Sequence, residues 1–219
     1  MNIKLICLSV LIVSLVVFGS VTGCSILGDN GVESAPYTLI LDDDASAIEV
    51  RNYESMILVS ASMEGDSRNN AFRKLFKYIT GENKGNTEIA MTAPVFMQAD
   101  DDVKEGLEIA MTAPVFMDPA GNEAMMSFVM PAEFTLESTP IPNDPSVVVS
   151  EVKNYKVATI KFAGTLSDRN VAAKTKVLKK WIQDNAYNIA SEPVMAGYNG
   201  PLTLPMFRHN EVLIQVKRK

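Results

Sequence analysis

Cysteine is almost absent from this chain of 219 residues, which contains only Cys7 and Cys24. Both lie near the N-terminus, so we expect the domain formed by the rest of the chain to have no thiol for a disulfide, a metal site or a nucleophile. Histidine is equally scarce: His209 stands alone, without a serine or aspartate at a spacing known to form a catalytic triad. No P-loop, GxGxxG or zinc-ligand spacing occurs either. We therefore expect a protein that is not an enzyme.

The chain also lacks an excess of positive charge. It has 20 lysines and arginines against 26 aspartates and glutamates, which gives a formal net charge of −6. Proteins that bind nucleic acid need a basic patch or stripe to neutralise phosphates, and the sequence has no such stripe. We therefore expect no nucleic-acid partner.

Residues 1–23 do not read as part of a folded domain. Lys4 is their only charge, and residues 5–18 form an apolar run broken only by two serines. A run of this length is typical of the core of a signal peptide and is too short for a comfortable membrane span. The segment ends in Val21-Thr22-Gly23-Cys24, which resembles a bacterial lipobox. That resemblance implies cleavage before Cys24 and acylation of its sulfur and its new amino group.

We therefore interpret residues 1–23 as a lipoprotein signal peptide, with a plain secretory signal or an uncut membrane anchor as the alternatives. Acyl chains on Cys24 would hold the protein on a lipid bilayer of the cell envelope, since several chains bind far better than one. Ser25 favours, by the same resemblance, the outer membrane facing the periplasm if the source is Gram-negative. Residues 24–36 are mostly small and polar, which indicates a tether.

The phrase EIAMTAPVFM occurs twice, at residues 88–97 and 108–117. Its apolar residues alternate with a period of two, which predicts a strand in each copy. Pro94 and Pro114 cannot donate a ladder hydrogen bond, so each marks a strand end, an edge or a bulge. The acidic segment between the copies favours a loop joining two antiparallel strands. The duplication thus predicts an added hairpin, which need not carry any chemistry.

A weaker repeat relates the two halves of the domain. The pentapeptide EVRNY at 49–53 recurs as EVKNY at 151–155. An alternating apolar stretch follows each copy, and then a helical pattern, at about 67–80 and about 168–185. The sequence therefore predicts two β-α-β-β halves that pair into one curved sheet or barrel with two helices packed on it. The strands expected after the helices are 88–97 and 108–117 in the first half and 194–198 and 211–217 in the second. The join between the halves, 125–149, contains expected strands at 125–130 and 134–136.

The helical patterns also predict which side chains face the core, because spacings of three and four place them on one stripe. In the first helix the inward residues are Ala71, Phe72, Leu75, Phe76 and Ile79. In the second helix they are Val171, Val177, Leu178, Trp181 and Ile182.

Six stretches of the domain carry a family resemblance: AFRKLFKYITGENK (71–84), IAMTAPV (89–95 and 109–115), SFVMPAEFTLE (127–137), PNDPSV (142–147), AGYNGP (196–201) and FRHNEVLIQV (207–216). They resemble the SOUL haem-binding-protein family, in that family's order along the chain. The resemblance spans about residues 37–217. It implies an α+β fold, a distorted antiparallel β-barrel with two helices and an internal two-fold repeat, in agreement with the pseudo-symmetric halves read from the sequence. Family members are described as binding haem or related tetrapyrroles and have no generally established catalytic reaction.

A tetrapyrrole needs a flat apolar slot with cations at its rim for the propionates. We expect the first helix and the AGYNGP turn to provide them, and the alternative is that the apolar stripe is core and the cations form a solvated face. His209 is a weak candidate for an axial iron ligand, because it precedes a strand in what reads as a turn. The candidate ligand-binding residues are Arg68, Phe72, Arg73, Phe76, Lys77 and Tyr198.

The sequence therefore predicts a domain at residues 37–219 of a lipid-anchored, non-catalytic envelope protein. Its expected ligand is haem, another porphyrin or a hydrophobic planar molecule, none of which the fold requires. The alternative is an envelope interaction or structural protein with the same fold and no physiological haem binding. A weaker third reading is a hydrolase or other enzyme acting on a small substrate.

Overall fold

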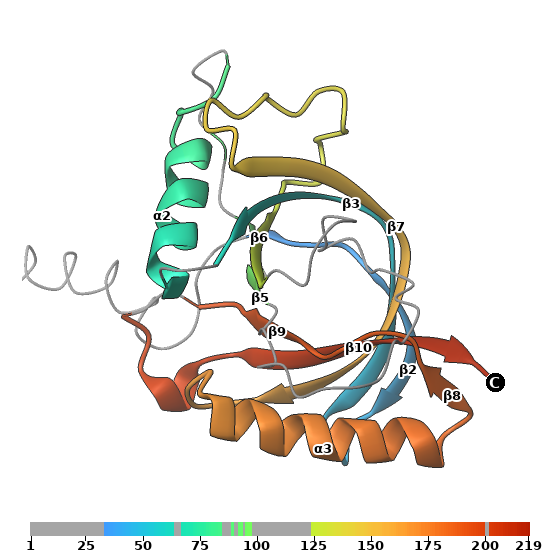
Figure 1. The fold of residues 1–219 in the computed structure, drawn as a ribbon. Coiled ribbons are helices and arrows are strands. Elements are labelled where there is room, and N and C mark those ends of the chain that lie inside the picture. The colour runs from blue at the N-terminus through green and yellow to red at the C-terminus, as the bar shows by residue number, and fades with distance from the viewer. Residues whose placement is uncertain are drawn as a thin grey trace, which may run out of the picture.

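The structure is a computed structural model that describes residues 33–63, 67–84, 89, 92–93, 95–97, 124–199 and 202–219. Figure 1 shows a curled sheet with the two longer helices on its outside. The elements are β1 (Glu33–Ser34), β2 (Thr38–Asp43), β3 (Ile48–Ser62), α2 (Ser67–Ile79), β4 (Thr92–Ala93), β5 (Val95–Met97), β6 (Met125–Val129), β7 (Val147–Phe162), α3 (Asp168–Asp184), β8 (Tyr187–Ile189), β9 (Val194–Gly197), the 3-10 turn η1 (Pro205–Phe207) and β10 (Asn210–Arg218).

The main sheet is antiparallel and has eight strands. Its order is β2-β3-β6-β5-β9-β10-β7, β8 pairs with β10, and β7 pairs again with β3. The sheet therefore curls round on itself, which confirms the predicted α+β class and the distorted antiparallel barrel. The short strands β1 and β4 form a separate parallel pair.

The two halves meet at the pentapeptide repeat. β3 and β7 pair antiparallel over most of their length, and Tyr53 lies directly opposite Tyr155. These tyrosines are the last residues of EVRNY and EVKNY, so the pseudo-two-fold relation between the two halves passes through this residue pair. The other contact between the halves pairs β5 with β9, which places Phe96 opposite Ala196. Each half contributes one long strand and one helix, followed by β5 and β6 after α2 and by β8, β9 and β10 after α3. The repeat predicted the order of strand, helix and strands, but β6 comes from the segment that was expected to join the two halves.

The long strands each change face where two consecutive residues are exposed, at Glu54-Ser55 in β3 and Lys153-Asn154 in β7. Before this point Val50 packs under α3, and after it Ile57 packs under α2. A strict period of two would keep odd-numbered and even-numbered residues on opposite faces throughout the strand. The break lets one strand pack against both helices.

Local hydrogen bonds and a glycine mark the start of α3 and the end of α2. The side chain of Ser167 caps α3 by accepting a hydrogen bond from the backbone N–H of Asn170 at 3.4 Å. Gly81 follows α2 with a φ of 108°, a conformation that glycine adopts readily. The backbone N–H of Glu82 then donates to the carbonyl of Lys77 at 2.9 Å, which ends the helix.

Three details differ from the sequence prediction. Residues 134–136 are irregular chain that leads into a turn at Leu136, not a strand, because the chain crosses from β6 to β7 there without a partner strand. Val177 is exposed, because α3 packs on the sheet through Leu178 and Ile182. Phe72 and Phe76 are only half-buried, and Leu75 and Ile79 form the inward face of α2 instead.

The first copy of the duplicated phrase supplies β4 and β5, and β5 inserts between β6 and β9. The second copy, at 108–117, lies outside the described residues, as do the expected signal peptide, Cys24 and most of the tether. Among the described residues, no helix is both long and apolar enough to cross a membrane.

Candidate ligand-binding site

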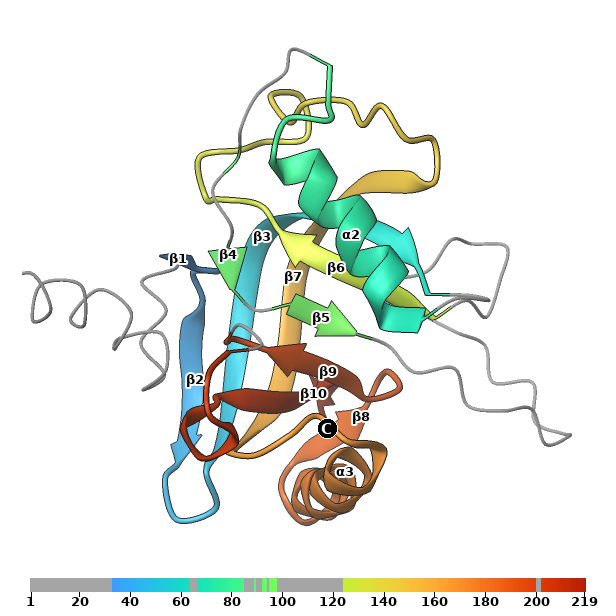
Figure 2. The same cartoon turned by 90° about the vertical axis from the view of Figure 1, so that its left-hand side faces the viewer.

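The outer side of α2 carries an exposed aromatic pair. The rings of Phe72 and Phe76 stack with their centroids 6.0 Å apart and an interplanar angle of 15°. The ring of Phe72 also packs edge to face with the buried ring of Phe128 on β6, with the two centroids 5.5 Å apart. This contact holds Phe72 in position. The two side chains remain 37% and 44% exposed. Figure 2 shows α2 lying across β6.

The pseudo-symmetry allows the aromatic pair of α2 to be compared with the equivalent positions of α3. Leu178 and Ile182 of α3 are buried and spaced by four, like Leu75 and Ile79 of α2. When these pairs are aligned, Thr175 and Lys179 of α3 occupy the places of Phe72 and Phe76. Packing of the helix on the sheet therefore does not require aromatic residues at these two places.

Arginines flank the aromatic pair on either side. With about 100° of rotation per residue, Arg68 lies about 40° before Phe72 around the helix axis and Arg73 about 60° beyond Phe76. Arg68 makes an exposed contact of 3.4 Å with Asp168, which is weak enough to be exchanged for another carboxylate. The face thus combines a flat apolar surface with one cation on each side.

The remaining cations of α2 face a different feature, a polar cleft of about 360 Å³ between this helix and the 142–147 segment. Lys77 forms an ion pair with Glu82 at 3.2 Å, and Lys74 donates to the hydroxyl of Ser146 at 2.9 Å. Arg73 reaches the rim of this cleft, so it adjoins both features. The cleft is lined by Asn70, Arg73, Lys74, Lys77, Tyr78, Glu82, Pro142, Asp144 and Val147.

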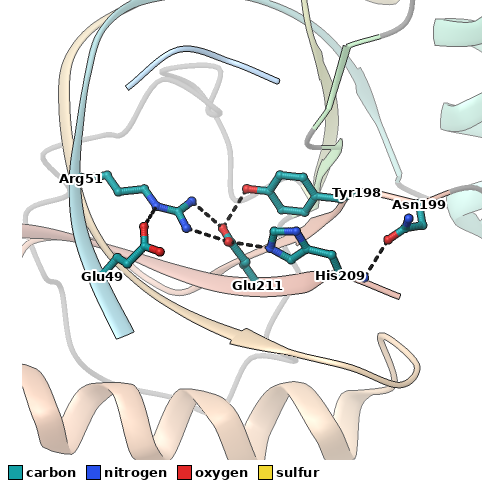
Figure 3. Close-up of polar contacts among 6 residues, drawn as sticks. All are labelled: Glu49, Arg51, Tyr198, Asn199, His209 and Glu211. Atoms are coloured by element: carbon teal, nitrogen blue, oxygen red, sulfur yellow. Dashed lines mark hydrogen bonds and ion pairs between the residues drawn. The ribbon is translucent and has the colours of Figure 1, made fainter. Parts of the chain in front are cut away.

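A second cluster of functional groups lies inside the curled sheet (Figure 3). Arg51 of β3 donates two parallel hydrogen bonds of 2.9 Å to the carboxylate of Glu211 on β10. The side chain of Glu211 is 0% exposed and that of Arg51 is 5% exposed. Arg51 also donates to Glu49 at 2.6 Å, and its guanidinium lies 4.5 Å from the ring centre of Tyr37. Such a bidentate, desolvated pair is strongly directional.

Tyr198 and His209 complete this interior cluster. The hydroxyl of Tyr198 donates to Glu211 at 2.8 Å, and Nε2 of His209 lies 2.8 Å from the other oxygen of the same carboxylate. The two rings stack at 3.9 Å with an angle of 5°. The side-chain amide oxygen of Asn199 accepts from the backbone N–H of His209 at 2.7 Å. Glu211 therefore has hydrogen-bond partners on both oxygens.

The pKa values follow from this arrangement. Burial alone would raise the pKa of Glu211, but the hydrogen bond from His209 and the charge of Arg51 outweigh it and lower the pKa to about 2. Burial raises the pKa of Tyr53 to about 12, and burial together with the charge of Glu211 raises that of Tyr198 well above its usual value. Glu211 is therefore ionised and both tyrosines are neutral at physiological pH.

The six residues expected to bind a ligand thus occupy three places. Arg68, Phe72 and Phe76 lie on the open face of α2, and Arg73 lies between that face and the cleft that contains Lys77. Tyr198 packs against a core cluster that contains no residue of α2. Whether any of the six contacts a ligand remains a prediction.

His209 lies in the interior network and not on an open turn, since its ring stacks on Tyr198 and binds Glu211. Among the described residues, no group of three or more histidine, cysteine, aspartate or glutamate side chains could hold a metal ion. Sequence reasoning missed Arg51 and Glu211, which are 160 residues apart. The sequence signal that could have indicated this pair is that Arg51 lies two residues before Tyr53, and so on the same, inward face of the predicted strand.

Comparison with known proteins places this fold. A family model described as "SOUL heme-binding protein" matches residues 32–215. The chain belongs to the SOUL heme-binding protein family. This SOUL-family chain is also similar to Heme-binding protein 1 of Xenopus tropicalis, with 23% identity over 193 residues, 83% of this chain and 91% of that protein.

Two solved structures resemble the SOUL-family chain in fold. The C-terminal domain of EcmrR matches with a TM-score of 0.50 and 13% identity, over 78% of this chain and 98% of that one. An uncharacterized conserved protein from Listeria innocua matches with a TM-score of 0.54 and 10% identity, over 78% and 93% of the two chains. At these identities the likeness concerns the fold alone.

Proposed function

We propose that this chain is a lipid-anchored, non-catalytic envelope protein that binds haem or a related planar tetrapyrrole on the open face of α2. The observation that carries the proposal is the stacked, half-exposed pair Phe72 and Phe76, which has no counterpart on α3. Membership of a family described as haem-binding supports the ligand class, and the exposed aromatic pair supports the location.

The chemistry of the α2 face fits such a ligand. A tetrapyrrole presents a broad apolar plane and two carboxylates, and aromatic side chains favour offset stacking on such planes. Arg68 and Arg73 flank the aromatic pair and can each donate charge-assisted hydrogen bonds to one carboxylate. Phe128 beneath Phe72 supports the ring from the core.

Binding on this face relies on apolar contact and not on a bond to iron. His209 is engaged by Glu211 and Tyr198 inside the sheet, where its role is structural. Removal of one aromatic ring should weaken binding by roughly 1–3 kcal/mol, or about 5- to 150-fold, from the apolar area lost. A porphyrin without iron should bind nearly as well as hemin.

The test is a titration of the chain with hemin and with metal-free protoporphyrin, followed by absorbance and by quenching of Trp181 emission. The variants are Phe76→Ala, His209→Ala and, as a matched control, Val177→Ala, which removes an exposed apolar side chain from the other helix. We expect only Phe76→Ala to weaken binding, and to weaken it for both ligands.

Two outcomes would contradict the proposal. If His209→Ala alone abolishes binding, or only the iron-containing ligand binds, iron ligation dominates. If neither ligand binds the unsubstituted chain, the protein is an envelope interaction protein that keeps the fold without the ligand. Incorporation of labelled fatty acid, compared between the wild type and Cys24→Ala, tests the lipid anchor separately.

A further inference from the structure

The connection between β9 and β10 carries an apolar tip at residues 202–207 that the proposed ligand site does not use. Leu202 is 82% exposed and Met206 70% exposed, and Leu204, Pro205 and Phe207 are exposed as well. Clusters of large apolar side chains that protrude in this way mark interaction sites on soluble domains.

The backbone holds these side chains outward. Thr203 is buried, and its carbonyl accepts a hydrogen bond of 2.8 Å from Nε of Arg208. The carbonyl of Pro205 accepts from the backbone N–H of Gly164 at 2.8 Å, and that of Leu204 from Phe207 at 2.9 Å within η1. The tip is thus a fixed turn, and its apolar side chains cannot fold back onto the domain without breaking these bonds.

The charge around the tip is opposite in sign to that of the whole protein. No aspartate or glutamate occurs between Glu192 and Glu211, whereas Arg208 follows the tip directly. The chain as a whole has a formal net charge of −6. An apolar protrusion with a cation at its base and no acid among the residues next to it in the sequence suits the boundary between acyl chains and anionic headgroups.

The start of the described chain restricts where a membrane can be. Residues 25–32 separate Cys24 from β1, and an extended chain of that length spans at most roughly 30 Å. In Figure 2 the connection from β9 to β10 lies at the left of the view, on the side where β1 and β2 also lie. A bilayer that holds acylated Cys24 therefore lies within about 30 Å of the start of β1.

We propose that the 202–207 tip inserts into the lipid bilayer and orients the domain on it, with Leu202 and Met206 entering furthest. This inference rests on the lipid anchor of the proposed function, which keeps the tip at high local concentration near the surface. A single small apolar tip binds a membrane weakly by itself, so anchor and tip act together.

The test uses tryptophan placed at the tip of the full-length, acylated chain. Met206→Trp is compared with Ile141→Trp, an exposed apolar position in the connection from β6 to β7, which lies at the top of Figure 1, whereas the connection from β9 to β10 lies at the lower left. The unsubstituted chain, which has Trp181 alone, provides the baseline. Each is reconstituted into phosphatidylethanolamine–phosphatidylglycerol vesicles with and without brominated acyl chains.

We expect brominated lipid to reduce the added Met206→Trp emission roughly twofold, as for a side chain about 5–10 Å below the headgroups. The Ile141→Trp emission should not change. If the acylated protein floats with vesicles but Met206→Trp is not quenched, the tip inference is wrong and the anchor stands. If acylation is absent yet added vesicles quench Met206→Trp, the anchor is wrong and the tip stands. A blue shift without quenching, in a chain that sediments as a dimer, would show that a second copy covers the tip and would overturn the inference.

Discussion

Replacement of Glu211 by leucine tests the interior cluster most severely. The substitution leaves the guanidinium of Arg51 buried with Glu49 as its remaining carboxylate partner. Breaking a buried ion pair by removing one partner costs about 3–5 kcal/mol, because the other charge stays desolvated. Replacing both members with apolar residues, Arg51→Met with Glu211→Leu, should cost much less than the single change.

The same carboxylate predicts a pH dependence. Its pKa of about 2 lies below the value of 4.5 expected for an unfolded glutamate. A lowered pKa means that the stabilisation is complete above about pH 4.5 and is lost as the pH falls towards 2. The difference corresponds to about 3 kcal/mol. The side chain in Glu211→Gln does not titrate. The difference in free energy of unfolding between the wild type and Glu211→Gln should therefore become smaller as the pH falls from about 4.5 to about 2.

The assay is urea unfolding followed by Trp181 fluorescence and circular dichroism at pH 7, 4.5 and 2.5. The indole N–H of Trp181 donates to Asp43 at 2.8 Å, so its emission reports loss of tertiary structure. The reasoning is refuted if Glu211→Leu costs less than about 1 kcal/mol, or if the double variant is no more stable than the single one.

Three further predictions concern the fold. Deletion of residues 98–117 removes the second copy of the duplicated phrase and shortens the connection from β5 to β6 roughly fourfold. A shorter loop loses less entropy on closing, so the free energy of unfolding in urea should rise by about 1 kcal/mol. A large loss of stability would show that the second copy contributes to the core. Ser167→Ala removes the cap of α3 and should cost about 1 kcal/mol by the same measurement. Leu178→Ala should cost about 2–5 kcal/mol, whereas Val177→Ala on the exposed side should change the midpoint little.

The fold was accessible from the sequence because its repeat is directly visible there. EVRNY and EVKNY mark the two long strands, and their final tyrosines lie opposite each other in the structure. The helices at 67–79 and 168–184 agree with the predicted bounds to within one residue at each end. In both helices a regular apolar spacing and a small residue at the boundary determined the local structure.

The site was less accessible, because its parts come from distant segments. Periodicity placed Phe72 and Phe76 on the same apolar stripe as Leu75. Which residues of the stripe are buried depends on where β6 lies under the helix, and this leaves Phe72 and Phe76 partly exposed. No local pattern indicates that Arg51 and Glu211 meet, since the strands that carry them are joined through β7. The sequence predicts Tyr198 as a ligand-contacting residue, which stays a prediction, but it does not predict that the hydroxyl of Tyr198 donates to Glu211.

The most direct measurement of the central claim is the location of a bound porphyrin on the folded chain. Nuclear magnetic resonance of the labelled domain from residue 25 onward, titrated with metal-free protoporphyrin, reports this through ring-current shifts. We expect the largest shifts at the rings of Phe72 and Phe76 and at the amides of α2 between Arg68 and Phe76, and small shifts at the α3 positions Thr175 and Lys179. Shifts concentrated at Tyr198 and His209, with α2 unaffected, would contradict the assignment of the α2 face as the ligand-binding site.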